Sequence, residues 1–301
     1  MREPPDEVRR LAEERAERRR ARDFSAADRL RERIRALGFE VTDRPDGGFD
    51  LTPWERPRPG PTLVRAEEVP SVLEEVPTAD VTVQWISEGW PEDVLRGIDS
   101  FRRFEGGRAV HHVVVETRPE AAGTWPEGVE VIPLAEDPGF GVARNVGLRR
   151  SRGRMVLVVD GSVEAQGDLY TPLEETIADP SVAVAGPYGL VTDDLREFRD
   201  HEGPDVDAVE GYMMAIRREL LADGVAFDER YRFYRAADIE LCFQVKLRGF
   251  RVVRVPVPVR RHEHRRWAAT SQADRERLSK RNFYRFLDTF RGRTDLLVSS
   301  R

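Results

Sequence analysis

The chain has 301 residues, of which 40% are hydrophobic and 35% charged, a length and composition that fit a folded protein of one or two domains and require no disorder. Its net charge of −6 argues against nucleic-acid binding over the whole surface, and its single cysteine, Cys242, excludes an internal disulfide framework and a multi-cysteine zinc site. Because no apolar run reaches about 18 residues and the N-terminal segment is charged, we expect a cytoplasmic protein without a membrane span.

The N-terminal segment has the pattern of a helical hairpin. Apolar residues recur at helical spacing over residues 6–22 and again over 25–37. Ser25 is placed to cap the second helix and Gly38 to end it. Residues 39–53 then alternate around a Pro-Asp-Gly-Gly turn, which predicts a short β-hairpin.

Composition divides the chain into a module over residues 1–55, a proline-rich linker over 56–78 and a large domain over 79–301. The letters "ARDFSAADRLRERIRALGFEVTDRPDGG" resemble the small helical domain at the C-terminus of cysteinyl-tRNA synthetases. Residues 1–45 contain thirteen arginines and eleven acidic residues, so this part is positively charged in an acidic chain. A contact with RNA or a protein partner through this module is one interpretation, and a solvated hairpin that docks on its own chain is the other.

From residue 80 onward short apolar runs alternate with helical patterns. The runs are "VTVQWI", "VHHVVVE", "VEVIPL" and "RMVLVVD", a succession typical of an α/β domain with a mainly parallel sheet. Ligands of such sheets gather at the carboxyl ends of the strands, which here carry Ser87 and Glu88, Glu116 and Asp160.

The stretch "GFGVARNVGLRRSRGRMVLVVDG" is open to two interpretations. Gly139, Gly141 and an acid about twenty residues on, Asp160, nearly match the dinucleotide-binding fingerprint. However, Arg144 stands where that motif needs a small residue, and four residues separate the preceding strand from Gly139. A nicotinamide cofactor is therefore the weaker interpretation.

The same stretch resembles the central block of family 2 glycosyltransferases of the GT-A fold, in which a Gly-x-x-x-Ala-Arg-Asn-x-Gly helix leads to a strand that ends in an Asp-x-Asp element. The resemblance continues through "VEGYMMAIRRELLADGVAFDERYRFYRAADIELCFQVKLRGFRVVRVPVPVRRHEH" and covers about residues 80–290. It implies an α/β, Rossmann-like GT-A domain with a mixed, mainly parallel sheet. It also implies transfer of a sugar from a nucleotide-diphosphate sugar to a hydroxyl acceptor.

The resemblance assigns the chemical steps to two acids in separate places. Asp238, in "RAADIEL", matches the general base that takes the acceptor proton, which implies inversion at the anomeric carbon. Asp160 matches the contact to ribose and to a divalent cation, Mn or Mg, and His262 fits the trailing histidine that helps to hold this cation slightly better than His264 does. The bland alternatives are an N-cap for Asp238, a turn cap for Asp160 and exposed histidines.

The donor nucleotide is assigned by the resemblance to the end of the second strand and to the following helix. Glu116 stands where the family has an acid that contacts the base, and Gly141, Arg144 and Asn145 lie on the first turns of the helix. Arg144 suits a diphosphate or a base edge, and an arginine on the helix surface is the alternative.

Four positions depart from the family pattern, and they keep a degenerate domain open as an alternative. The Asp-x-Asp element is Asp160-Gly161-Ser162, the paired acids of the second strand are Glu116-Thr117, the acidic pair before the helix is Ala237-Asp238, and a later arginine is Gln244. Loss of a carboxylate weakens metal binding unless Glu164 or a histidine compensates. The alternative function is therefore a binding or scaffold module. A nucleotidyltransferase is disfavoured because "VQWISEGWPED" lacks a glycine-rich loop.

Overall fold

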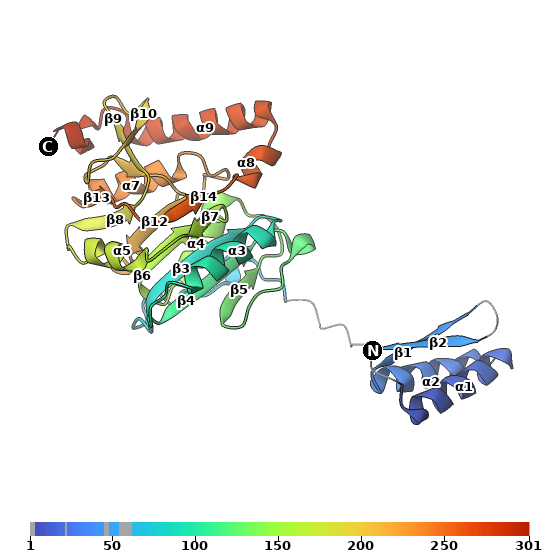
Figure 1. Ribbon diagram of the computed structural model, residues 1–301. Helices are drawn as coiled ribbons and strands as arrows, with labels where there is room; N and C mark the ends of the chain where they lie inside the picture. Colours follow the sequence, from blue (N-terminus) through green and yellow to red (C-terminus); the bar gives the residue numbers. More distant parts are fainter. Residues whose placement is uncertain (1–3, 22, 45–47, 54–61, 301) are drawn as a thin grey trace. The chain divides into compact units, whose positions relative to one another are not determined.

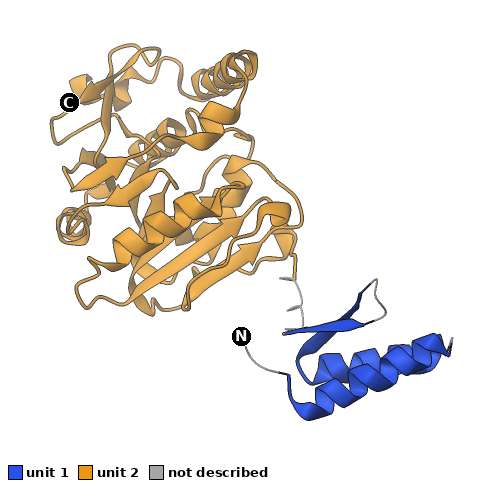
Figure 2. Ribbon diagram, turned by 45° about the vertical axis from the view of Figure 1, so that its right-hand side comes forward, with its two compact units in different colours: residues 1–61 blue, residues 62–301 orange. Residues whose placement is uncertain are grey.

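The computed structural model describes residues 4–21, 23–44, 48–53 and 62–300. They form two compact units, Met1–Pro61 and Thr62–Arg301, which Figure 2 shows in separate colours.

The first unit is a helical hairpin with a β-hairpin, as the sequence predicts. It contains α1 (Asp6–Arg20), α2 (Phe24–Ala36) and the antiparallel strands β1 (Phe39–Asp43) and β2 (Phe49–Pro53). Apolar side chains from both helices and from β1 close a small core: Val8, Leu11, Ala12, Leu30, Ile34, Phe39 and Val41. Gly38 follows α2 with φ of 84°, so it ends this helix as expected. The N-cap is Asp23 rather than Ser25, because the Asp23 carboxylate accepts the Ala26 N–H at 3.1 Å.

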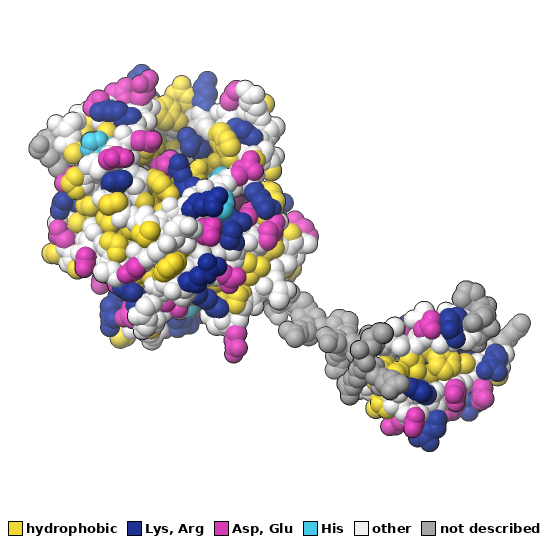
Figure 3. All heavy atoms as spheres, in the orientation of Figure 1, with side chains coloured by type: hydrophobic (Ala, Val, Ile, Leu, Met, Phe, Trp, Pro, Cys, Tyr) yellow, Lys and Arg dark blue, Asp and Glu magenta, His cyan; other side chains and the backbone are white. Residues whose placement is uncertain are grey.

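Several arginines of this unit are paired within the unit. Arg15 is buried and donates to Asp43 at 2.6 and 3.1 Å, and Glu40 accepts from both Arg31 and Arg35. Acidic and basic side chains are interspersed on the face of this unit that Figure 3 shows. A surface of mixed sign is typical of a solvated helical hairpin.

A seven-stranded sheet forms the centre of the second unit (Figure 1), with strand order β13-β8-β12-β6-β3-β4-β5. The strands β3 (Ala79–Ser87), β4 (Val110–Glu116), β5 (Val129–Pro133) and β6 (Gly153–Val159) run parallel. β12 (Met213–Arg217) is antiparallel to both β6 and β8 (Val182–Gly186), and β13 (Arg251–Arg254) is parallel to β8. The sheet is therefore mixed and mainly parallel, as the alternating pattern predicted.

Helices cover both faces of this sheet, because the buried strands are apolar on both sides. α3 (Pro91–Arg102) and α5 (Tyr170–Ile177) pack on one face with side chains such as Val83 and Trp85. α4 (Phe140–Arg149), α6 (Arg218–Ala222) and α7 (Ala237–Leu247) pack on the other face. Cys242 of α7 is fully buried in this second layer, so its role is packing, as the base rate for a lone thiol indicates.

Smaller elements stand over one end of the sheet (Figure 1). β9 (Gly189–Thr192) pairs with β10 (Phe198–His201) and β11 (Ala208–Val209), and β7 (Val163–Ala165) pairs with β14 (Val259–Arg261). The chain then forms α8 (Arg265–Ala269) and α9 (Gln272–Phe290), followed by the 3-10 turns Thr294–Leu296 and Val298–Ser300. Two other 3-10 turns lie earlier in the chain, at Ala66–Glu68 and Pro119–Ala121. Phe286 and Phe290 of α9 pack on Phe243 of α7, so the amphipathic C-terminal helix packs on its own domain.

Residues 62–78, which we expected to be linker, lie within the second unit. Val64 forms a parallel bridge with Leu134, and the N–H of Val72 donates to the Arg149 carbonyl at 2.8 Å. Extended segments without helical or strand periodicity give no sign in the sequence that they pack on a domain. Among the described residues, no helix has the length and hydropathy that crossing a bilayer requires.

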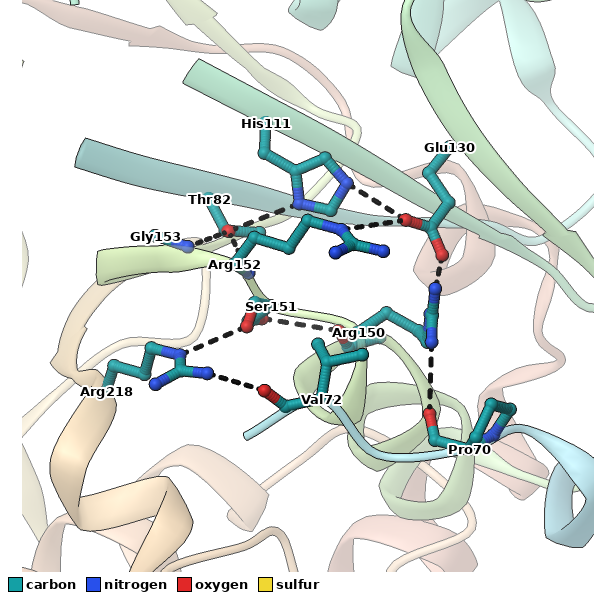
Figure 4. Close-up of polar contacts among 11 residues, drawn as sticks. Pro70, Val72, Thr82, His111, Glu130, Arg150, Ser151, Arg152, Gly153 and Arg218 are labelled. Carbon is teal, nitrogen blue, oxygen red and sulfur yellow. Dashed lines mark hydrogen bonds and ion pairs between the residues drawn. The ribbon is translucent and has the colours of Figure 1, made fainter. Parts of the chain in front are cut away.

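A polar network fixes the turn between α4 and β6 at the amino-terminal end of the sheet (Figure 4). Thr82 Oγ1 accepts the N–H groups of Arg152 and Gly153 at 2.9 and 2.8 Å, and Glu130 accepts from Arg150 at 2.6 Å. A Cβ on Gly153 would stand 2.2 Å from the Thr82 nitrogen, so only glycine fits there. The network sets the register of β6, the strand that leads to Asp160.

Candidate functional site

Acidic and hydroxyl side chains stand at the carboxyl ends of three neighbouring strands. Ser87 ends β3, Glu116 ends β4, and Asp160 follows β6 directly. Since β6, β3 and β4 are adjacent in the sheet and run parallel, these residues share one edge. The position that the sequence predicted for a ligand site is thus a real edge of the fold.

Asp160 is held in one orientation by the turn that follows it. Its Oδ1 accepts the N–H and the hydroxyl of Ser162 at 2.9 and 2.5 Å, and its Oδ2 lies 3.3 Å from Nε2 of His264. Burial opposes ionisation of this carboxyl, but the contacts with His264 and Ser162 outweigh burial and lower its pKa to about 2. Asp160 is therefore ionised over the physiological range, and Ser162 acts as its hydrogen-bond partner.

His264, and not His262, is the histidine beside Asp160. The ring of His264 stacks on Tyr234 with centroids 4.4 Å apart. Its Nδ1 accepts the N–H of Trp267 at 3.1 Å, so its Nε2 carries a hydrogen and donates to Asp160. The imidazole thus links the end of β6 to the first turn of α8.

His262 faces another partner. Its Nε2 lies 2.7 Å from the carboxylate of Glu164, a pair that joins β14 to β7. The chain leaves β14 at Arg261 and bends into α8, so His262 and His264 do not follow one strand alternation. His264 is therefore the histidine in contact with Asp160, whereas His262 and Glu164 are engaged with each other.

Asp238 lies in the first turn of α7 and its carboxylate faces the loop before β12. Oδ2 accepts the N–H of Gly211 at 2.7 Å, and Oδ1 accepts the N–H of Ile239 at 2.9 Å. Burial raises the pKa of Asp238 above its ordinary value, against the lowering effect of these two hydrogen bonds. Ala236, with φ of 65°, is the residue that precedes the helix, so Asp238 is inside the first turn rather than the N-cap.

Glu210 is an acid of the site that sequence reasoning missed. Burial and then the charge of Asp238 raise the pKa of Glu210. Its carboxylate pairs with Arg261 at 3.1 Å, and the Arg261 guanidinium lies over the rings of Tyr188 and Tyr212 at 4.4 and 4.6 Å. The strand before Glu210, β11, is only two residues long, so no periodicity signalled its position.

Asp160 and Asp238 face one cleft of about 540 Å³, a size within the range of small-molecule sites. β9 and β10 form one wall of the cleft and α9 forms another; a hollow on this side of the second unit appears in Figure 3. The lining combines aromatic, acidic and basic side chains: Phe140, Arg144, Asp160, Leu190, Arg196, Phe198, Asp200, Glu210, Tyr212, Tyr234, Arg235, Asp238, Ile239, His264, Ser279, Lys280 and Phe283, with Gly211 and Ala236.

The three candidate residues on α4 have structural partners. The guanidinium of Arg144 is buried and donates to Gln84 Oε1 at 2.7 Å and to the Val159 carbonyl at 3.2 Å, and burial lowers its pKa to about 10. Asn145 accepts the N–H of Phe227 at 2.9 Å and donates to its carbonyl at 2.9 Å. A Cβ on Gly141 would stand 2.5 Å from the Asp228 carbonyl oxygen. Arg144 reaches the cleft wall, whereas Asn145 and Gly141 hold the chain before α7.

Glu116 orders the loop that follows β4. Its Oε1 accepts the N–H of Gly123 at 2.8 Å and the indole N–H of Trp125 at 3.0 Å, and the side chain is buried. These two hydrogen bonds give the Glu116 carboxylate a structural role in the loop.

α8 covers the side of Asp160 that faces β3. Arg265 pairs with Asp93 at 2.9 Å and with Glu92, and Arg266 pairs with Glu88. Burial lowers the pKa of Arg266. A small cavity of about 30 Å³ lies between α8 and the ends of β3 and β6, beside these ion pairs.

Comparison with known proteins places the second unit among glycosyltransferase folds. No family model matches the chain. A Drosophila melanogaster protein named "Putative inactive polypeptide N-acetylgalactosaminyltransferase 12" is 27% identical over 157 residues, which cover 42% of this chain and 27% of that protein. The chain thus spans about a quarter of the length of this curated relative.

One solved structure, that of GalNAc-T7, supports the same fold. GalNAc-T7 in complex with UDP, GalNAc and Mn²⁺ superposes with a TM-score of 0.53 at 16% identity, over 71% of this chain and 48% of that chain. A mannosyltransferase of Pyrobaculum calidifontis in complex with GDP-mannose and Mn²⁺ gives 0.47 at 20% identity, over 64% and 59%. TarS of S. aureus in complex with UDP gives 0.47 at 14% identity, over 69% and 72%. The fold of the second unit is the GT-A glycosyltransferase fold, as the sequence resemblance implied.

Proposed function

We propose that the protein is a glycosyltransferase that moves a sugar from a nucleotide-diphosphate sugar to a hydroxyl acceptor, with inversion. The observation that carries this proposal is the pair of carboxylates in one cleft, Asp160 and Asp238. Their surroundings shift the two pKa values in opposite directions, downward for Asp160 and upward for Asp238. Such a separation is typical of acids that divide electrostatic and proton-transfer roles.

Asp238 is the candidate general base. In the transfer, the acceptor oxygen forms a bond to the anomeric carbon while its proton passes to Asp238. The bond from that carbon to the diphosphate breaks, and its electron pair leaves with the diphosphate. A carboxylate that burial makes more basic accepts this proton more readily, and direct displacement inverts the anomeric centre.

Asp160 and His264 are the residues that would hold a divalent cation. A carboxylate oxygen and an imidazole nitrogen suit Mn²⁺, and Mg²⁺ or Mn²⁺ bound by one or two protein ligands commonly takes the rest from phosphates and water. No cluster of three or more His, Cys, Asp or Glu residues with metal-binding placement occurs in the described part of the chain, so the donor phosphates would complete the coordination. His264 would bind the cation through Nε2 only as its other tautomer, with the hydrogen moved to Nδ1 and the bond from the Trp267 N–H lost. The cation would neutralise charge on the leaving diphosphate.

The donor nucleotide belongs on the β3 and β4 side of Asp160 under this proposal. Because Arg265 and Arg266 tie α8 to Asp93 and Glu88 on this side, we expect α8 to move when a nucleotide enters. Arg144 reaches the cleft wall, and it can contact the donor only if it gives up its hydrogen bonds to Gln84 and Val159. Glu116 can contact the donor only if it gives up its hydrogen bonds from Gly123 and Trp125.

A second candidate function is a GT-A domain that binds a ligand without transferring sugar. The observation that favours it is the engagement of Ser162 with Asp160, because a hydroxyl replaces the second carboxylate of the family element. The N-terminal unit would then dock RNA or a protein, and its likeness to the synthetase domain stays a prediction. That residues 1–55 and 79–301 fold independently is likewise a proposal, with residues 62–78 belonging to the second unit.

Calorimetric titration of UDP, GDP and dTDP, each with and without Mn²⁺ or Mg²⁺, tests the proposal. We expect metal-dependent binding of one nucleotide that Asp160→Ala abolishes, and release of sugar from the matching donor. His262→Ala is the matched control, since that ring pairs with Glu164 and should leave the affinity unchanged. Metal-dependent binding without any sugar release by wild type would favour the ligand-binding module, and absence of binding would refute both the donor site and its cation.

A further inference from the structure

The cleft that contains Asp238 is ringed by basic side chains that lack acidic partners. Arg196 follows β9, Arg235 precedes α7 and Lys280 lies on α9, and all three are exposed. No carboxylate of the described residues lies within ion-pair distance of any of them, whereas Arg261 pairs with Glu210 of the same cleft lining. Unpaired cations that converge on one cleft indicate an anionic ligand.

The acids of the same cleft are, with one exception, already engaged. Asp160 bonds to His264, Glu210 pairs with Arg261, and Asp238 accepts two backbone N–H groups. Asp200 of β10 is the exception, because it is exposed and has no side-chain partner among the described residues. The lining carries four acids and four basic side chains in all, and its three exposed cations, Arg196, Arg235 and Lys280, have no ion-pair partner among the described residues.

The lining of the cleft also contains apolar side chains. Phe198 of β10 and Phe283 of α9 are half-buried, and Phe140, Leu190 and Ile239 add to this apolar part. Covering such side chains stabilises a complex in proportion to the apolar area removed from water. A purely polar sugar would leave this area uncovered.

We propose that the acceptor is an amphiphilic hydroxyl compound that carries an oxyanion, a phosphate or a carboxylate, next to an apolar body. Its hydroxyl reaches Asp238 at the floor, its apolar body lies between Phe198 and Phe283, and its oxyanion meets Arg196 and Lys280 at the mouth. This assignment rests on the proposed transferase function, since it names the acceptor class of the same cleft.

The test compares two fluorescent probes of nearly equal shape, anilinonaphthalene sulfonate and its uncharged analogue phenylnaphthylamine, by equilibrium titration of the full chain. Wild type should bind the sulfonate about five- to tenfold more tightly, as expected for partly exposed charge pairs. The double variant R196A/K280A should lose this preference. The control R199A/R281A removes the same two positive charges outside the cleft and should retain it.

Competition then identifies the oxyanion. Displacement of the sulfonate probe by octyl phosphate but not by octanoate assigns a phosphate, and the reverse assigns a carboxylate. Equal displacement by octanol, a wild type that prefers the uncharged probe, or a preference that survives in R196A/K280A would each overturn the proposal.

These outcomes are separable from the transferase function. If a nucleotide donor is cleaved but the charge preference is missing, only the acceptor class is wrong. If the preference is present but no nucleotide binds, the transferase function fails and the cleft remains a site for anionic amphiphiles.

Discussion

Replacement of Asn145 by alanine distinguishes a donor contact from a structural clamp. The Asn145 side chain accepts the Phe227 N–H and donates to the Phe227 carbonyl, both at 2.9 Å, and it also donates to Glu229 at 3.2 Å. Asn145 is 8% exposed and Phe227 is 3% exposed, so water does not easily replace the lost partner. The substitution therefore leaves a buried backbone donor and a buried acceptor unsatisfied.

Each orphaned backbone group costs about 1–3 kcal/mol, so we expect N145A to lower the free energy of unfolding by about 2–6 kcal/mol. Because a folded domain is stabilised by only about 5–15 kcal/mol, the midpoint of urea unfolding should fall markedly. Circular dichroism during urea titration measures the loss, and nucleotide titration of the remaining folded protein measures affinity. If the free energy of unfolding changes by less than about 0.5 kcal/mol while the nucleotide affinity falls strongly, the structural role of Asn145 is refuted and its role as a donor contact is supported.

Three further substitutions test the site and its support. Asp238→Asn should lower the rate of sugar transfer by about 10²- to 10⁴-fold and leave the nucleotide affinity unchanged, and a wild-type rate in D238N would reject the role of Asp238 as the base. Because burial raises the pKa of Asp238, the activity of the wild type should fall on acidification at a pH above the ordinary range of an aspartate. Burial raises the pKa of Glu240 to about 7 from 4.5, so the wild type should lose stability as the pH rises through 7, and Glu240→Gln should flatten this dependence in thermal melts recorded from pH 5 to pH 8. Lys246→Ala removes the ammonium group that lies 2.6 Å from the buried carboxylate of Asp207, and it should lower the free energy of unfolding in urea by about 3–5 kcal/mol. A decrease below about 1 kcal/mol would show that this buried pair is dispensable.

The sequence predicted the four parallel strands β3, β4, β5 and β6 of the large sheet. Runs such as "VTVQWI" and "VHHVVVE" are apolar on both faces because helices cover both sides of the sheet, and this pattern is local enough to be read directly. The positions of Asp160 after a strand and of Asp238 in a first helical turn were predictable for the same reason. The hairpin of the N-terminal unit was also predictable, from the spacing of its apolar residues and from Gly38.

Partners that lie far apart in the chain were beyond the sequence. Whether His262 or His264 meets Asp160 depends on the bend between β14 and α8, and spacing alone slightly favoured His262. Arg144 and Asn145 carried the motif of a donor site, but their nearest atoms belong to Gln84 and Phe227.

What the sequence by itself determined was the succession of elements and the edge of the sheet that bears the acids, because periodicity and strand ends are properties of neighbouring residues. The tertiary structure alone decided which charges are neutralised and which remain free. Residues 62–78 joined the second unit, Glu210 found Arg261, and the cations at the cleft mouth were left unpaired. Hydrogen bonds and ion pairs act over a few ångströms in space, and only the folded chain brings distant residues within that range.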